Sequence, residues 1–148
     1  MKVAVVTGAS RGIGRACALR LARDGYITVV NYAHSEPEAA AVLDEIRAAG
    51  GDGMLCRADV SDPAQVAAMM RAVSKAYGQI DVLVNNAGIL FTQCTVESLS
   101  AERINRVLAT NVTGYFLCCR EAVKRMSHRH GGKGGAIVNV LSFCNLSR

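Results

Sequence analysis

TGASRGIG, residues 7–14, is the stretch that decides the fold, because it joins a strand-like run to a stretch of helical period. At such a junction, backbone N–H groups and the positive end of a helix can hold a phosphate. Glycines at 8, 12 and 14 let the backbone turn tightly and approach a ligand or a strand without a Cβ in the way. The spacing is G-x-x-x-G-x-G, and Ile13 and Gly14 stand where a Walker motif needs Gly-Lys. Taken alone, the loop could also be a tight turn with no ligand.

Outward from this loop, apolar runs of strand length alternate with segments of helical period. Strands are expected at 3–7, 27–31, 53–59, 81–87 and 136–140, and helices at 12–24, 36–49, 63–77 and from 101 to about 129. The strands are apolar throughout, which is typical of strands buried on both faces of a parallel sheet. Five strands and four helical segments predict right-handed βαβ units in one Rossmann-like, doubly wound α/β domain over residues 1–148.

The predicted helix boundaries rest on residues that cap helices. Ser35 followed by Glu38 predicts a capping box, and Asp62 before Pro63 predicts a cap ahead of a proline in the first turn. Glycines follow the predicted helices at 25, 50, 51, 78, 131 and 132, where a left-handed residue can end a helix. These signals place the loops at the ends of the strands.

Composition excludes several classes of protein. The chain is 51% hydrophobic and 20% charged, which favours one soluble globular domain, and its first apolar run is too short for a signal segment or a membrane span. We therefore expect a cytoplasmic protein that does not enter membranes. The six cysteines contain no C-x-x-C pair, so we expect reduced, mostly buried thiols and no metal site.

The basic residues favour no nucleic-acid partner. The net charge is +5, and one cluster stands out, formed by Arg120, Lys124, Arg125, Arg129 and Lys133. No aromatic residues interleave it, so a solvated end of a helix is favoured over nucleic-acid binding.

Three further motifs follow in order: Asp59-Val60 after the third strand, NNAG at 85–88 after the fourth, and N-x-x-G at 111–114. Together with the glycine loop, they resemble the short-chain dehydrogenase/reductase family over residues 1–142. The resemblance implies an oxidoreductase that transfers hydride between a nicotinamide cofactor and a carbonyl or alcohol substrate, whose identity the sequence does not give. It implies a cofactor site in which Gly8, Ser10, Arg11, Gly12, Ile13 and Gly14 hold the diphosphate, Asp59 and Val60 flank the adenine, and Asn86, Ala87 and Gly88 line the ribose.

Two of these motif residues have alternative roles. The amides of NNAG serve equally well to tie neighbouring strand ends together. Asn111 is expected to interrupt the helical bonding so that a main-chain carbonyl binds a water of a proton relay, the alternative being an exposed helix residue.

The resemblance also implies a catalytic serine, Ser142, and a tyrosine with a lysine four residues later. The 148 residues contain no such pair, because the tyrosines at 26, 32, 77 and 115 are followed four positions on by Val, Glu, Asp and Cys. We expect this chain alone to turn over no substrate at a rate typical of the family. A fragment, a shifted reading frame and a genuine short form would each explain why these 148 residues contain no such pair.

We expect the cofactor to be NADP(H) rather than NAD(H), although NAD(H) is possible. The second strand ends in Asn31, and residues 26–35 contain no carboxylate to accept a hydrogen bond from a ribose hydroxyl or to repel a 2′-phosphate. Arg11 is the expected donor to that phosphate, and Asn31→Asp is expected to favour NAD(H).

An interaction role is the alternative to an enzyme. In this second interpretation the chain is a non-catalytic nucleotide-binding or interaction module, whose helix 101–129 pairs with a relative or a second copy. Ile137, Val138 and Val140 also predict self-association, because they border an uncovered sheet edge.

Overall fold

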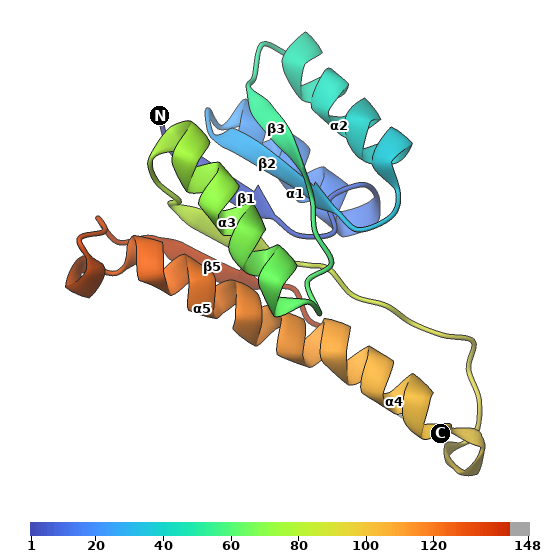
Figure 1. The fold of residues 1–148 in the computed structure, drawn as a ribbon. Helices are drawn as coiled ribbons and strands as arrows, with labels where there is room; N and C mark the ends of the chain where they lie inside the picture. The colour runs from blue at the N-terminus through green and yellow to red at the C-terminus, as the bar shows by residue number, and fades with distance from the viewer. Residues whose placement is uncertain (143–148) are drawn as a thin grey trace.

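The computed structural model describes residues 1–142 and contains one parallel sheet of five strands in the order β3-β2-β1-β4-β5 (Figure 1). The strands are β1 (Val3–Val6), β2 (Ile27–Tyr32), β3 (Gly53–Arg57), β4 (Val82–Asn85) and β5 (Ala136–Asn139). From β1 the chain moves outward to β2 and β3, then returns to the other side of β1 for β4 and β5. This order confirms the doubly wound sheet, and its direction reverses between β1 and β4.

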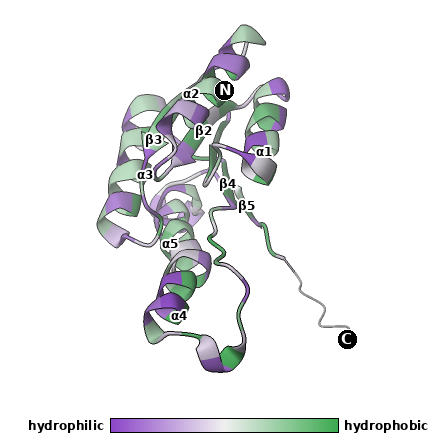
Figure 2. Ribbon diagram, turned by 90° about the vertical axis from the view of Figure 1, so that its right-hand side faces the viewer, coloured by the Kyte–Doolittle hydropathy of each residue, from purple (hydrophilic) through white to green (hydrophobic). Residues whose placement is uncertain are grey.

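Helices cover both faces of the sheet. α1 (Gly12–Arg23) and α2 (Glu36–Ala48) lie on one face, and α3 (Pro63–Tyr77) and α5 (Gly114–Met126) lie on the other (Figures 1 and 2). α4 (Ala101–Leu108) continues the line of α5 beyond the sheet, and a long loop leads to it from β4 (Figure 1). Among residues 1–142, no helix is long and apolar enough to cross a membrane.

The core consists of two apolar layers, one on each face. Every residue of β1 and β2 is buried, so these strands have no solvent-exposed face. On one face the apolar side chains of α3 and α5, Met70 among them, pack on the sheet, and on the other face those of α1 and α2, such as Ile46, do the same. β5 is different: it lies at the edge of the sheet, and Val138 is 48% exposed.

The predicted helix from 101 to about 129 is wrong as a single element. It divides into α4, a π-helical segment η2 (Ala109–Thr113), α5, and a short 3-10 turn η3 (His128–His130). The split at η2 includes Asn111, where the motif implied an interruption of the helical bonding.

The structure supports one of the two predicted N-caps. Asp62 caps α3 by accepting hydrogen bonds from the backbone N–H groups of Ala64 and Gln65. The capping box at Ser35 is wrong: the ψ of Ser35 is 68°, far from the extended backbone of Asp62, and its side chain accepts no capping hydrogen bond from α2. Glycines with positive φ do follow α1, α2 and α3, as expected.

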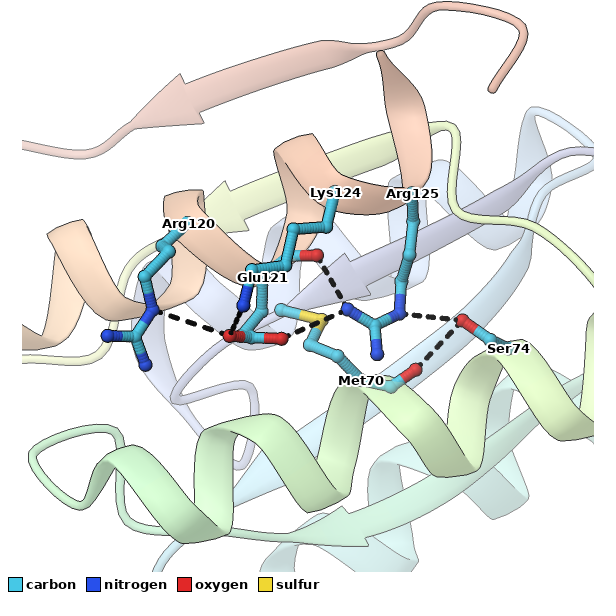
Figure 3. Close-up of polar contacts among 6 residues, drawn as sticks. All are labelled: Met70, Ser74, Arg120, Glu121, Lys124 and Arg125. Carbon is cyan, nitrogen blue, oxygen red and sulfur yellow. Dashed lines mark hydrogen bonds and ion pairs between the residues drawn. The ribbon is translucent and has the colours of Figure 1, made fainter. Parts of the chain in front are cut away.

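The basic cluster is not simply a solvated helix end. Glu121, whose side chain is 7% exposed, lies between α5 and α3 and pairs with Arg120, Lys124 and Arg125 (Figure 3). Arg125 also donates to the hydroxyl of Ser74 on α3, at 2.9 Å. The hydrogen bond from Lys124 is the main cause that holds the pKa of the Glu121 carboxyl below its usual value.

The expectation of mostly buried cysteines is wrong. Within the described residues only Cys118 is buried, Cys94 is exposed, and the other three are partly buried. Burial raises the pKa of the Cys118 thiol to about 12, so this thiol stays protonated. The described residues contain no group of side chains that could hold a metal ion. Cys144 lies outside the described residues.

Candidate functional site

A cavity of about 370 Å³ opens at the carboxyl ends of the strands. Its walls come from the end of β2 and from the segments that follow β1, β2, β3 and β4, together with α4 and η2. Ligands of open α/β sheets bind at this edge, beside the point where the strand order reverses. Nine of the predicted cofactor residues line it: Gly8, Ser10, Arg11, Asn31, Asp59, Val60, Asn86, Ala87 and Gly88.

The glycine loop forms the floor of the cavity. Gly8 has a φ of +61°, and a Cβ there would lie 2.8 Å from the Cα of Ala87. Gly14 is buried in α1, where a Cβ would lie 2.4 Å from both the carbonyl oxygen of Gly8 and the Asn86 amide nitrogen. Only glycine therefore allows the loop, α1 and the end of β4 to approach this closely. Gly12, Ile13 and Gly14 support the loop without lining the cavity.

The N-terminus of α1 has no side-chain cap. Its N-cap residue is Arg11, no side chain accepts a hydrogen bond there, and the first turn contains no acidic residue. By contrast, α3 has its N-terminal N–H groups satisfied by Asp62. The donors at the start of α1, next to Ser10 and Arg11 on the cavity wall, are thus available to an anion.

Asn31 and Asn86 tie the strand ends together. The Asn31 amide donates to the carbonyl oxygens of Cys56 and Ala58, and its Oδ1 accepts a hydrogen bond from the N–H of Gly8. Asn86 donates to the carbonyl oxygens of Thr7 and Gly8, both at 3.0 Å. Both amides line the cavity while performing this tying role, so the two roles weighed for Asn86 are compatible.

The contacts of Asn31 change the meaning of the Asn31→Asp test. Asn31 is 1% exposed, and an aspartate there would place a carboxylate against two carbonyl oxygens. Loss of the site through misfolding is then the expected outcome, rather than a change of cofactor.

Asp59 and Val60 form the wall below β3. The Asp59 Oδ1 accepts hydrogen bonds from the N–H and the hydroxyl of Ser61, which orient the carboxylate. Gly114 packs against Val60 so closely that a Cβ would lie 2.8 Å from its Cγ2. The glycine of the N-x-x-G motif therefore permits the contact between the start of α5 and this wall.

Asn111 holds the segment after β4. Its Oδ1 accepts the N–H of Ile89 at 2.8 Å and its Nδ2 donates to the Ile89 carbonyl at 2.9 Å. The exposed-residue alternative is therefore wrong, because both polar atoms of the side chain are paired. Asn111 itself does not line the cavity.

Ser142 lies apart from the cavity. It is exposed, follows β5 by three residues, and is absent from the cavity wall. Nearby, the Tyr115 hydroxyl donates to the carbonyl oxygen of Val140 at 2.8 Å. Burial raises the pKa of Tyr115, the opposite of the shift that a proton-donating tyrosine needs near neutral pH.

Ten residues of the cavity wall were not predicted from the sequence. These are Tyr32, Ala33, His34, Ser35, Ala58, Ser61, Ile89, Arg106, Ala109 and Thr110. Several lie within four residues after the end of a predicted strand, so the rule that ligands bind beyond the carboxyl ends would have found them. Arg106, on α4, has no such signal, because only the fold brings it to the cavity.

The fold and the cavity define a doubly wound α/β protein with a cavity at the carboxyl ends of its strands. A family model described as short chain dehydrogenase matches residues 2–147. The chain therefore belongs to the short-chain dehydrogenase/reductase family, as its motifs indicated.

Similar proteins agree with this assignment. The chain is 61% identical to "Uncharacterized oxidoreductase YgfF" of Escherichia coli, over 98% of this chain and 59% of that protein. It is 43% identical to "3-oxoacyl-[acyl-carrier-protein] reductase FabG" of Staphylococcus aureus, over 95% of this chain and 56% of the relative.

A solved structure has the same fold. A double mutant of a Serratia marcescens short-chain dehydrogenase/reductase superposes with a TM-score of 0.84 at 39% identity, covering 93% of this chain and 54% of the other. The chain thus spans a little over half the length of the proteins it matches.

Proposed function

We propose that residues 1–142 bind NADP(H) in the cavity and form the cofactor-binding part of an oxidoreductase that acts on a carbonyl or alcohol substrate. The uncapped N-terminus of α1 beside the glycine loop is the observation that supports this most strongly. A diphosphate satisfies the free N–H donors there, and the positive end of the helix favours its charge.

Each part of the cavity would hold one part of the cofactor. Ser10 and the first N–H groups of α1 would hold the diphosphate, while Gly8 and Gly14 keep the backbone close enough. Asp59 and Val60 would flank the adenine, and Ala87 with Gly88 the ribose. When bound, the nicotinamide would supply or accept the hydride.

The preference for NADP(H) rests on charge. Residues 26–35 contain no carboxylate, and the part of the wall that follows β2 consists of Ala33, His34 and Ser35. Arg11 lines the same cavity, and among residues 1–142 no ion pair engages it. A charge-assisted hydrogen bond from Arg11 to the 2′-phosphate, worth about 1.5–3 kcal/mol, would favour NADP(H) roughly ten- to a hundredfold.

Calorimetric titration with NADPH and NADH tests the preference. We expect the wild-type chain to bind NADPH about tenfold or more tightly than NADH. Ala33→Asp should reduce this ratio, because a carboxylate on the wall repels the 2′-phosphate, whereas the neutral control Ala33→Asn should preserve it. Equal affinity of the wild type for the two cofactors would contradict the preference, and no binding of either would contradict the proposed function.

A role as an interaction module is the second candidate. The observation that supports it is the helical arm, which consists of α4, η2 and α5 together. Ile104, Leu108, Val112, Phe116 and Val123 are 42–74% exposed and recur at intervals of four or seven residues along α4, η2 and α5. This spacing places apolar side chains along one side of a helix. We propose that a second copy of this chain, or a full-length relative, packs on this apolar stripe.

A cytoplasmic location stays a prediction.

A further inference from the structure

Two arginines of α4 contact one aromatic ring but have different surroundings. The guanidinium carbons of Arg103 and Arg106 lie 5.3 and 5.4 Å from the centroid of Phe91. Arg103 also donates to the carbonyl oxygen of Thr92 and to the sulfur of Cys94, so it holds the loop after β4. Across residues 1–142, the Arg106 side chain makes no hydrogen bond or ion pair, and it lies over the ring of Phe91.

Only one of these arginines reaches the cavity. Arg106 lines it together with Ala109 and Thr110, the residues one helical turn further along, whereas Arg103 does not. The cavity wall thus includes two arginines, Arg11 and Arg106, and one residue with a carboxylate, Asp59. That carboxylate already accepts two hydrogen bonds from Ser61. The charge balance of the described wall favours an anionic ligand.

We propose that Arg106 is an affinity-determining residue that contacts the phosphorylated adenosine half of the cofactor from α4, and that Phe91 holds its guanidinium in place. The inference rests on the proposed function and adds a residue from outside the sequence motifs. Guanidinium groups are planar, stack on aromatic rings and donate several hydrogen bonds to phosphate or to a base. Stacking on Phe91 restricts the long Arg106 side chain before the ligand arrives, which lowers the entropy lost on binding.

The contact would also join α4 to the strand ends of the sheet. Arg106 lies on α4, beyond the sheet, whereas the glycine loop and Asp59 belong to the strand ends (Figure 1). A nucleotide that contacts both Arg106 and the strand ends would link α4 to the sheet. Binding should then protect the amides of α4 from hydrogen exchange, although α4 carries none of the family's motifs.

Paired variants test the proposal, with NADPH and the adenosine bisphosphate that carries the 2′-phosphate as probes. Arg106→Met should weaken the binding of both probes about fivefold, while Arg103→Met, which removes the same charge over the same ring, should change it less than about twofold. Arg106→Lys should fall between Arg106→Met and the wild type. Circular dichroism spectra would establish that the variants fold.

Phe91→Leu provides a second, independent test of the proposal. It should weaken binding in the wild-type background but have no further effect in Arg106→Met, because Phe91 acts through Arg106. Equal losses in Arg103→Met and Arg106→Met, or unchanged affinity in Arg106→Met, would overturn this inference while leaving the proposed function intact. Failure of the wild-type chain to bind NADPH would overturn both.

Discussion

At the scale of single residues, the buried carboxylate of Glu121 depends most strongly on its partners. It needs its cations, because an ionised group that is 7% exposed loses most of its hydration. We expect Glu121→Gln to lower the free energy of unfolding by about 1–3 kcal/mol, since Arg125 then keeps only neutral partners in a partly buried position. Asp24→Asn, at the exposed pair Arg20–Asp24, should cost about 0.5 kcal/mol or less. Urea denaturation measures both, and equal costs would contradict the role of burial.

The same carboxyl predicts a dependence on pH. Its pKa is lower in the folded chain than in the unfolded one, so the unfolded state takes up protons first as the pH falls. The stabilisation by Glu121 is therefore complete above the unfolded pKa of about 4.3 and disappears as the pH falls through the lower folded pKa. Glu121→Gln should flatten the fall in stability in this acidic range, and an unchanged pH profile would contradict the assignment.

Residue by residue, the sequence predicted the site where a local rule applied. Gly8 and Gly14 were identifiable because close backbone approach requires glycine, and Asp59 because it matches the family's motif after the third strand. The burial of Glu121 was not predictable, because the basic residues around it on α5 suggested only a solvated face. Arg106 was missed for a similar reason: a lone arginine on a helix becomes part of a site only through tertiary structure.

At the scale of elements, alternation of apolar runs was enough to predict the order of strands and helices. Alternation alone did not predict the break between α4 and α5, because the apolar pattern continues through η2. The N-x-x-G motif did imply an interruption there, and Asn111 binds the backbone of Ile89 at that point. The strand ends also fell short of the prediction: β3 stops at Arg57 and β4 at Asn85, since the residues that follow turn to form the cavity wall.

Two elements present apolar residues that other copies of the chain could cover, the apolar stripe of α4–α5 and the edge strand β5. We expect sedimentation to show self-association of the wild type, and Phe116→Glu to reduce it, because Phe116, 74% exposed, is the most exposed residue of the apolar stripe. Val138→Lys, on β5, separates the two surfaces, since a lysine blocks pairing at a sheet edge. A wild-type chain that stays monomeric at high concentration would contradict both interfaces, and reduction by Val138→Lys alone would assign the contact to the edge.

At the scale of the whole molecule, binding and turnover should separate. The cavity lies within the described residues, but the 148 residues contain no Tyr-x-x-x-Lys, and the raised pKa of Tyr115 makes it a poor proton donor. Without general acid catalysis, reduction of a carbonyl is slowed by about 10²–10⁴-fold. We expect this chain to oxidise NADPH negligibly with a panel of ketones and aldehydes, compared with a chain extended by the remaining family fold with its tyrosine and lysine. Equal rates would contradict this division.

The central claim is that the strand ends and the N-terminus of α1 form a nucleotide site, and an amide NMR titration with NADPH tests it most directly. The claim predicts saturable changes in amide chemical shift, concentrated in residues 8–14, 59–61 and 86–89, where the backbone surrounds the cavity. Gly14→Ala should abolish these shifts while the chain remains folded, because its Cβ would displace the loop at Gly8. Shifts confined to the α4–α5 surface, or no shifts at all, would contradict the claim.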